Sequence, residues 1–278
     1  MQGVFLFSAL ISVLAIVLIG VFVFGGGLPF IAKYGLGNFL LGEKWTPSNT
    51  PAAFGILPMI VGSVSVTLGA VLIGVPIGVL TAVFMAKFCP PKLYKLLKPA
   101  VNLMAAIPSI VYGFFALQLI VPLMRELFGG TGMNMLTVML LLGVMILPTI
   151  IGMSESAIRA VPESYYSGSL ALGATHERSV MKVILPAAKS GILSSIVLGV
   201  GRAIGETMAV VLVAGNQPRI PEALTQGVRT LTTNIVLEMS YAAGQHREAL
   251  IATAVVLFGF ILLINGIFML IKRKETVK

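Results

Sequence analysis

The stretch GILSSIVLGVGRAIGETMAVVLVAG, residues 191–215, decides the fold class of this chain. A helix needs about 20 apolar residues to cross the hydrocarbon core of a bilayer. This stretch exceeds that length, and its only charged side chains are Arg202 and Glu206. A charge at the centre of a membrane helix costs about 2.5 to 3.5 kcal/mol on insertion scales, so a pair of them marks a pathway, a gate or a structural lock.

Arg202 and Glu206 are four residues apart, which would place both side chains on one face of the predicted helix. Arginine before glutamate is the weaker orientation of such a pair relative to the helix dipole. We therefore expect the pair to serve a function beyond the stability of one helix.

Five further apolar runs have the length of membrane spans, at about 4–26, 56–86, 100–122, 135–157 and 249–271. With residues 191–215 they predict an all-α membrane protein of six transmembrane helices, organised as a single domain over residues 1–278. In the second run, we expect Pro58 and Gly62 to delay the start of the helix and Pro76 to kink it. The composition agrees, since 57% of residues are hydrophobic and 10% are charged, against about 25% charged residues in soluble domains.

The few cysteines and histidines argue against several classes of chemistry. Cys89 is the single cysteine, and His176 and His246 are far apart in sequence, so we expect neither a disulfide framework nor a metal site. The net charge of +9 would suit nucleic acid, but no basic stripe with interleaved aromatic residues accompanies it. We expect no nucleic-acid partner and interpret the charge as a signal of membrane topology.

Lysines and arginines are unevenly divided between the two sets of loops that six spans create. Twelve of the nineteen lie at about 87–98, 158–190 and 272–278, six lie in the other loops, and Arg202 lies within a span. Because cytoplasmic loops carry the excess of positive charge, both termini are expected in the cytoplasm.

The longest connection on that side, residues 158–190, is predicted to form two short helices around a turn. Pro162 suits the start of the first helix, Gly173 can end it in the left-handed conformation, and Thr175 can cap the second. We expect Pro186 to end the second helix before the next span. An exposed helical hairpin with an apolar stripe suggests a docking element.

The order SLALGAT at 169–175 followed by LP at 185–186 resembles the coupling motif of ATP-binding-cassette (ABC) importer permeases, whose loop inserts into a cleft on the ATPase. Ser167, Gly168 and Ser169 replace the usual Glu-Ala-Ala opening of that motif. The resemblance implies an ATPase-coupling role for Leu172, Gly173, Ala174, Thr175, His176, Glu177, Ile184, Leu185 and Pro186. The alternative is an amphipathic loop helix on the membrane surface, which would not require the glycine at this spacing.

Within that superfamily the chain resembles the permeases of the phosphate-specific transport (Pst) system. The likeness is carried by FGILPMIVGSVSVT at 54–67, AAIPSIVYGFF at 105–115, MILPTIIGMSESAIRAVP at 145–162 and GRAIGETMAVVLVAGN at 201–216. The Trp45-Thr46-Pro47 element and the IPSIVYG segment favour the PstC type over the partner PstA type, which shares the GET segment. A permease for another oxyanion is a further alternative.

The resemblance implies a type I ABC importer permease with a MetI-like bundle, a cytoplasmic coupling helix and a place in the bacterial inner membrane. It implies a second, PstA-like permease, two PstB-like ATPase subunits, and a periplasmic or lipid-anchored PstS-like phosphate-binding protein. The chain would be no enzyme and would hold no cofactor, because ATP and Mg would be bound by the ATPase. The sequence has no glycine-rich loop with Lys and Ser or Thr that would cradle phosphates of ATP.

A path for phosphate through a membrane needs hydrogen-bond donors and positive potential. We expect Arg202 to contact the anion and Glu206 to compete for the same guanidinium. The alternative is a static lock, within this helix or to the partner permease. A rival from another class is an ion-coupled secondary transporter that uses the pair as a relay, and it leaves the coupling motif unexplained.

Further candidates for the path are Ser63, Ser65 and Thr67 on the second span, Ser109 and Tyr112 after Pro108, and Thr207 and Asn216 beside the charged pair. These hydroxyls could instead bond backbone carbonyls, Pro108 could merely kink its helix, and Thr207 and Asn216 could cap or pack helices. Trp45 is expected to anchor at the lipid headgroups or to contact the binding protein. We expect His246 to be solvated and His176 to contact a partner.

Overall fold

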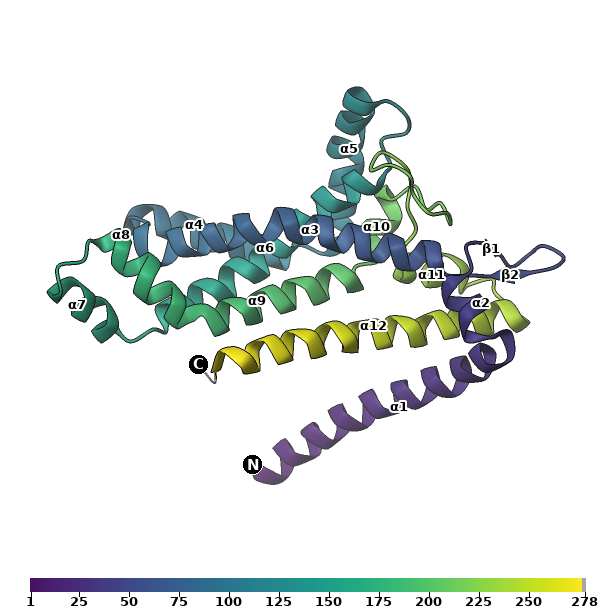
Figure 1. The fold of residues 1–278 in the computed structure, drawn as a ribbon, viewed down its shortest axis with the longest axis horizontal. Coiled ribbons are helices and arrows are strands. Elements are labelled where there is room, and N and C mark those ends of the chain that lie inside the picture. The colour runs from purple at the N-terminus through teal and green to yellow at the C-terminus, as the bar shows by residue number, and fades with distance from the viewer. Residues whose placement is uncertain (277–278) are drawn as a thin grey trace.

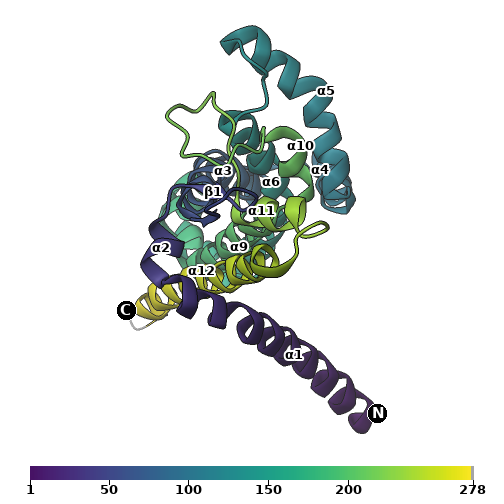
Figure 2. The same cartoon turned by 90° about the vertical axis from the view of Figure 1, so that its right-hand side faces the viewer.

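Long helices that lie side by side form the body of the molecule (Figure 1), and the computed structural model describes residues 1–276. The body consists of α3 (Leu57–Val83), α6 (Met135–Arg159), α9 (Leu185–Gly205) and α12 (Gly244–Thr276). α1 (Gln2–Tyr34) packs on α12, and its N-terminal half projects away from the body (Figure 2). Shorter elements gather at the two ends of the body, which we call the hairpin end and the loop end.

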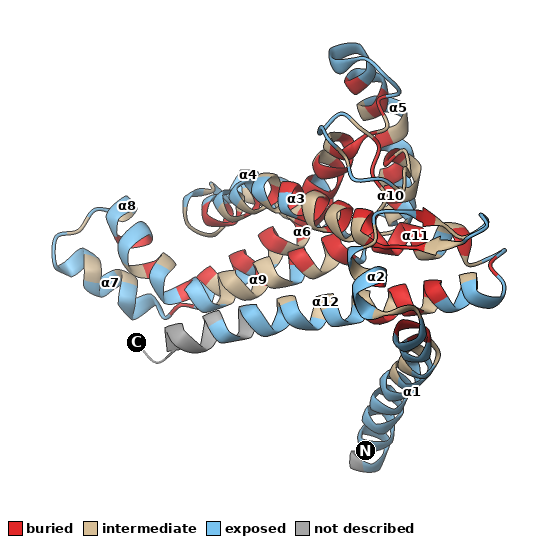
Figure 3. Cartoon of the chain, turned by 45° about the vertical axis from the view of Figure 1, so that its right-hand side comes forward, coloured by how far each residue is buried: buried red, intermediate tan, exposed pale blue. Residues whose placement is uncertain are grey.

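Six helical segments among the described residues are long and apolar enough to cross a membrane. They are Gly3–Tyr34, Leu57–Phe88, Ser109–Phe128, Met135–Arg159, His176–Gly205 and Gly244–Ile267. The predicted all-α class and the number of spans are therefore confirmed. Buried residues line the contact between α3 and α6 and gather again at the loop end (Figure 3), and α6 is the most enclosed of the six.

Glycines on α3 allow α6 to approach closely. A Cβ atom at Gly74 would lie 2.7 Å from Ile146, and one at Gly78 would lie 2.8 Å from Ile150. Because real Cβ atoms do not approach neighbours so closely, the small residues set the distance between the two helices.

The second apolar run forms α3, which begins at Leu57 with Pro58 in its first turn and Gly62 inside the helix, so the expected late start is wrong. Pro76 lies inside the helix, which continues to Val83. A π-helical turn, Phe84–Phe88, then ends the span.

The third apolar run, predicted as one span over 100–122, is two helices. α4 (Pro91–Ala106) ends before Ile107, and α5 (Ser109–Phe128) begins after Pro108. A proline disfavours the helical conformation of the residue before it, and Ile107 is extended with φ −67° and ψ 126°. α5 turns away from the body (Figures 1 and 2) and packs against α10 (Met208–Val213).

The run 191–215 is also broken, so the prediction that Arg202 and Glu206 share one helix face is wrong. α9 ends at Gly205, and Glu206 is extended with φ −70° and ψ 127°. The Glu206 carboxylate accepts a hydrogen bond from the N–H of Ala209 (3.1 Å), and Thr207 Oγ1 donates to the carbonyl of Gly205 (3.2 Å). These local side-chain bonds compete with the helical ones and stabilise the break.

The hairpin end is formed by α7 (Glu163–Ala171) and α8 (His176–Ser179). Gly173 takes the left-handed conformation (φ +82°) and the Thr175 hydroxyl accepts from the N–H of Arg178, which confirms the predicted turn and cap. We define the coupling hairpin as residues 163–184.

The prediction that Pro186 ends the second helix of the hairpin is wrong. α8 continues through a π-helical turn, Val180–Ile184, directly into α9. The N–H of Leu185 donates to the carbonyl of Val180, and Pro186 lies in the first turn of α9. Because the wide turn shifts the hydrogen-bond pattern just before the proline, the missing N–H does not interrupt the helix.

The loop end collects α2 (Leu36–Leu41), the two-stranded antiparallel pair β1 (Trp45–Thr46) and β2 (Ala53–Phe54), and α11 (Leu231–Glu238). Trp45 pairs with Phe54 across the strands, and both side chains are buried. The sequence had predicted for Trp45 a contact with lipid headgroups or with a binding protein, whereas the indole is 4% exposed and belongs to the core of this end.

Candidate functional site

Arg202 lies in the last turn of α9, on the stretch where α9 packs against α6. Its Nη1 donates a hydrogen bond to Thr149 Oγ1 on α6 (3.3 Å), and the guanidinium is close enough to Tyr112 on α5 to interact with it electrostatically. Arg202 is partly exposed, and within residues 1–276 it makes no ion pair with a carboxylate. A cation with spare donors therefore lies at the junction of three helices.

Glu206 is not paired with Arg202 in this conformation. Its carboxylate is engaged at the first turn of α10 by the N–H of Ala209, and its backbone carbonyl accepts from Thr232 Oγ1 (3.2 Å). The predicted competition between Glu206 and an anion for Arg202 would require this contact to open, so that role stays a prediction.

Tyr112 and Ser109 lie at the start of α5, just after the break. The Tyr112 hydroxyl donates to the carbonyl of Met104 near the end of α4 (2.8 Å) and so bridges the break. The chain is broken before Pro108 rather than merely kinked, and a contact of Ser109 with an anion stays a prediction.

The hydroxyls predicted on the second span are directed into the protein. Ser63 Oγ accepts from the N–H of Leu231 (2.9 Å) and ties α3 to α11, rather than bonding a carbonyl one turn back. Thr67 is buried, and its hydroxyl finds no hydrogen-bond partner among the described residues. Ser65 is partly buried.

Thr207 and Asn216 have the local roles that the sequence left open. Thr207 bonds within the break, and Asn216, with φ +50°, donates from its amide to the carbonyl of Val211 (2.7 Å) at the end of α10. Both residues shape the short helix beside Arg202, and a contact with substrate stays a prediction for each.

The coupling hairpin has an exposed tip and a buried base. Leu172 is 91% exposed and follows a helix that buries none of its residues, whereas Ile184 and Val180 are fully buried against Ala188 and Ile158. Thr175, Glu177 and Pro186 are exposed, and Ala174 and Leu185 are half-buried. The tip at 172–177 is therefore the part that a partner could reach.

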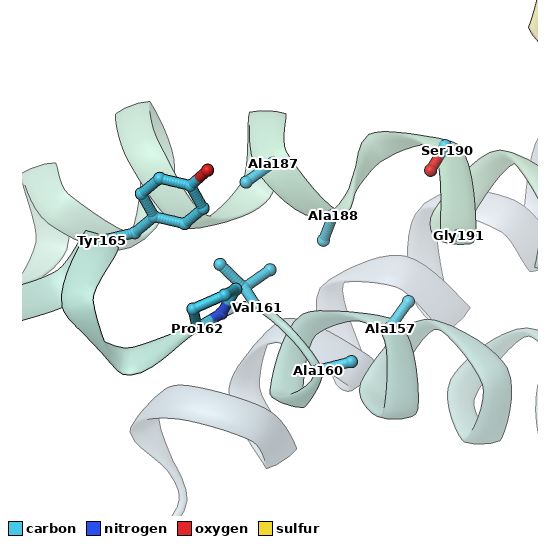
Figure 4. Close-up of a pocket in the computed structure, with 9 residues that line it drawn as sticks. All are labelled: Ala157, Ala160, Val161, Pro162, Tyr165, Ala187, Ala188, Ser190 and Gly191. Atoms are coloured by element: carbon cyan, nitrogen blue, oxygen red, sulfur yellow. The ribbon is translucent and has the colours of Figure 1, made fainter. Parts of the chain in front are cut away.

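A pocket of about 300 Å³ lies at the base of the coupling hairpin (Figure 4). Small residues of the last turns of α6 and the first turns of α9 face each other across it, and the ring of Tyr165 lies beside it. Its lining consists of Ala157, Ala160, Val161, Pro162, Tyr165, Ala187, Ala188, Ser190 and Gly191.

His176 is held inside the chain at this end. Its Nδ1 lies 2.8 Å from the Tyr166 hydroxyl, and its Nε2 lies 3.2 Å from the carbonyl of Lys87. Both ring nitrogens are engaged, and the ring packs on Phe88 with centroids 4.9 Å apart. The predicted contact of His176 with a partner stays a prediction, and its observed contacts join the hairpin to the end of α3.

Glu155 is a buried charge that the sequence analysis missed. The carboxylate is 2% exposed and accepts from the Tyr94 hydroxyl (2.7 Å), Lys98 Nζ (2.7 Å) and Arg159 Nε (2.8 Å). The hydrogen bond to this carboxylate raises the pKa of Tyr94 above its usual value, so the hydroxyl remains a donor. A single acid in an otherwise apolar run, with a cation four residues later, was the signal available in the sequence.

Glu238 forms a second missed cluster, at the loop end. Its carboxylate accepts from Arg229 Nη1 (2.5 Å) and Trp45 Nε1 (2.9 Å), and it lies 2.8 Å from His246 Nε2. The expectation that His246 is solvated is wrong, because its side chain is 13% exposed and contacts Glu238 and Trp45. Arg229 and His246 lie nine and eight residues from Glu238, whereas Trp45 comes from a distant segment that no local pattern in the sequence could have joined to it.

No group of three or more His, Cys, Asp or Glu side chains that could hold a metal ion occurs in the part of the chain that the structure describes.

Residues 74–277 match the family described as binding-protein-dependent transport system inner membrane component. The Bacillus subtilis protein described as probable ABC transporter permease protein YqgH is 39% identical over 84% of this chain and 76% of its own length. The phosphate transport system permease protein PstC of Mesorhizobium japonicum is 32% identical over 92% of this chain and 85% of its own. PstC of Haemophilus influenzae is 31% identical over 99% of this chain and 93% of its own length.

Solved ABC transporters have a similar fold. A chain of the inward-facing MetNI methionine ABC transporter superposes with a TM-score of 0.64 over 79% of this chain and 95% of that one, at 22% identity. A chain of the bacterial alginate ABC transporter superposes with a TM-score of 0.63 over 95% of this chain and 95% of that one, at 15% identity. The fold and the sequence matches agree, and the chain belongs to the family of inner membrane components of binding-protein-dependent transport systems.

Proposed function

We propose that this chain is the transmembrane permease subunit of an ATP-driven importer of inorganic phosphate. Relatives named as PstC phosphate permeases match it over nearly its whole length. The observation that carries the proposal is Arg202, a cation without a carboxylate partner among the described residues, at the junction of α5, α6 and α9.

Arg202 suits an anion that must be held and then released. A guanidinium can hold a phosphate through two parallel hydrogen bonds. Here it is fixed by a single bond to Thr149, which leaves donors for the substrate. One cation in a partly exposed position attracts the anion without trapping it, as conduction requires.

In this proposal Glu206 acts as a gate that either leaves Arg202 free for the anion or pairs with it. While its carboxylate accepts from the Ala209 N–H, it leaves Arg202 to the anion. A shift of α10 would release Glu206 to pair with Arg202 and displace the anion. The competing role, a static lock, is supported by the bond between Arg202 and Thr149, because that bond already joins α9 to α6.

The hairpin end faces the cytoplasm in this proposal, and so do both termini. Positive charge supports this orientation, because twelve of the nineteen lysines and arginines belong to the segments expected on that side. The loop end then faces the binding protein. The exposed tip with Leu172 and Gly173 would insert into the ATPase.

Other subunits are needed to complete the transporter. We infer a second, PstA-like permease, two PstB-like ATPases and a PstS-like phosphate-binding protein. One coupling hairpin offers one docking surface, whereas an ATPase dimer offers two, so a pair of permeases is expected. ATP and Mg would be bound by the ATPase, and this chain would hydrolyse nothing and hold no cofactor.

Phosphate uptake into proteoliposomes tests the proposal. The full set of subunits should take up labelled phosphate only when ATP is supplied on the ATPase side, and excess sulfate should compete poorly. Uptake by this chain alone, without the ATPase, would instead support an ion-coupled secondary transporter. ATP-dependent uptake of sulfate in place of phosphate would indicate a permease for another oxyanion.

A further inference from the structure

The hairpin end contains a buried carboxylate that the proposed path does not use. We propose that Glu155 is a positioning residue that makes α4 move together with the coupling hairpin. A displacement of the hairpin by a nucleotide-driven partner would then reach the break before α5, where Tyr112 and Arg202 lie. The inference rests on the proposed function and assigns the route of coupling within it.

Glu155 on α6 attaches α4 to the body through hydrogen bonds to its carboxylate. Two donors, Tyr94 and Lys98, come from successive turns of α4, and the third, Arg159, comes from the last turn of α6. α4 packs mainly against α6, so few other contacts determine its position. A carboxylate that is 2% exposed and bound by three donors fixes this position strongly, because removing it would leave two cations facing each other.

Arg159 connects this cluster to the π-helical turn at the end of α3. Pro90 and Pro91 follow that turn and have no N–H, and the N–H of Cys89 is bound to the carbonyl of Phe84. The last carbonyls of the turn therefore need side-chain donors. Arg159 Nη2 donates to one of them, the carbonyl of Met85, at 2.8 Å.

His176 binds a second carbonyl of the same turn from the coupling hairpin. The carbonyl of Lys87 can only accept, so Nε2 of His176 carries the proton and Nδ1 accepts from the Tyr166 hydroxyl. Tyr166 lies on α7 and His176 on α8, so both helices of the hairpin are attached to the turn. The hairpin, the end of α3, α6 and α4 thus form one connected polar network.

The far end of α4 leads to the candidate path. The carbonyl of Met104, one turn before the break, accepts from the Tyr112 hydroxyl (2.8 Å), and Tyr112 lies within electrostatic range of the Arg202 guanidinium without a hydrogen bond to it. A shift of α4 along α6 would therefore move Tyr112 relative to Arg202. Chains of hydrogen bonds and packed side chains of this kind can carry coupling between distant sites.

The test measures phosphate taken up per ATP hydrolysed by the full complex in proteoliposomes. Glu155→Gln keeps the shape of the side chain and removes its charge, and Tyr94→Phe removes one donor without leaving a charge unpaired. We expect Glu155→Gln to hydrolyse ATP while the uptake per ATP falls at least about fivefold, the lower end of typical coupling effects. Tyr94→Phe should lower the ratio less.

Glu126→Gln is the matched control, because Glu126 is an exposed acid on α5, and its ratio should equal that of the wild type. An unchanged ratio in both Glu155→Gln and Tyr94→Phe would overturn the inference. If Glu155→Gln does not assemble, Tyr94→Phe decides in the same way. Failure of the proposed function is distinguishable, because it would appear as absent ATP-dependent phosphate uptake in the wild type.

Discussion

Glu155 and Glu238 are buried carboxylates at opposite ends of the body, and each binds donors both from its own neighbourhood in the sequence and from a distant segment. A buried charge is tolerated only when it is paired and fully hydrogen-bonded. The sequence shows both acids and the cation Arg159 four residues after Glu155, but it does not reveal Tyr94, Lys98 or Trp45 as partners, because those contacts arise only when distant segments pack. Trp45 illustrates the consequence, since its hydrogen bond to Glu238 places it in the core rather than at a membrane surface.

Glu238→Gln should destabilise the loop end. The change removes the charge that pairs with Arg229, and breaking a buried pair costs about 3 to 5 kcal/mol. Thermal unfolding of the purified complex measures the effect. Glu222→Gln, at an exposed position, serves as the control, and equal unfolding temperatures for the two variants would contradict a structural role for Glu238.

Helix length and class follow from the sequence, but the helix breaks do not. Six apolar runs in the sequence correspond to six membrane spans, because the length and apolar composition of a segment determine whether it can cross the bilayer as a helix. Pro108 explains the break at Ile107, but Pro186, which has the same breaking chemistry, lies inside a continuous helix. The break at Glu206 depends on local side-chain hydrogen bonds. The predicted shared helix face of Arg202 and Glu206 is wrong because α9 ends at Gly205, and their role in transport stays a prediction.

Gly173→Ala tests whether the turn of the coupling hairpin is needed for docking of the ATPase. Gly173 has φ +82°, and no atom lies within 4 Å of a Cβ placed there, so strain of about 1 to 2 kcal/mol rather than a clash would result. We expect the altered turn to reduce co-purification of the ATPase. Gly168→Ala has equal space and no positive φ, so it should keep the ATPase bound. Equal recovery with both variants would argue against docking at this turn.

Gly74→Val tests the contact between α3 and α6. The added side chain would overlap Ile146 and the carbonyl of Gly143, and overpacking of this kind costs about 1 to 3 kcal/mol. A lower unfolding temperature is expected for the purified complex. Gly152→Val on α6, where a Cβ meets nothing within 4 Å, should change it little. Similar temperatures for the two variants would contradict the close packing.

The whole molecule is a membrane bundle with two distinct ends, and the distribution of positive charge predicts which end faces the cytoplasm. In a Cys89→Ser background, Ser48→Cys at the loop end should react with a membrane-impermeant thiol reagent in intact cells. Leu172→Cys at the hairpin tip should react only after permeabilisation, although its side chain is 91% exposed. The reverse pattern would place the coupling hairpin outside the cytoplasm and exclude its docking to an ATPase.

The most direct measurement is the initial rate of ATP-driven phosphate uptake by complexes that carry Arg202→Met or Arg202→Lys, with assembly verified for each. A hydrogen-bonded contact to a charged group contributes about 1.5 to 3 kcal/mol, so Arg202→Met should lower the rate by roughly 10-fold or more. Arg202→Lys, which keeps the charge and loses the fork of donors, should retain an intermediate rate. Near-normal uptake by both assembled variants would show that phosphate does not pass Arg202.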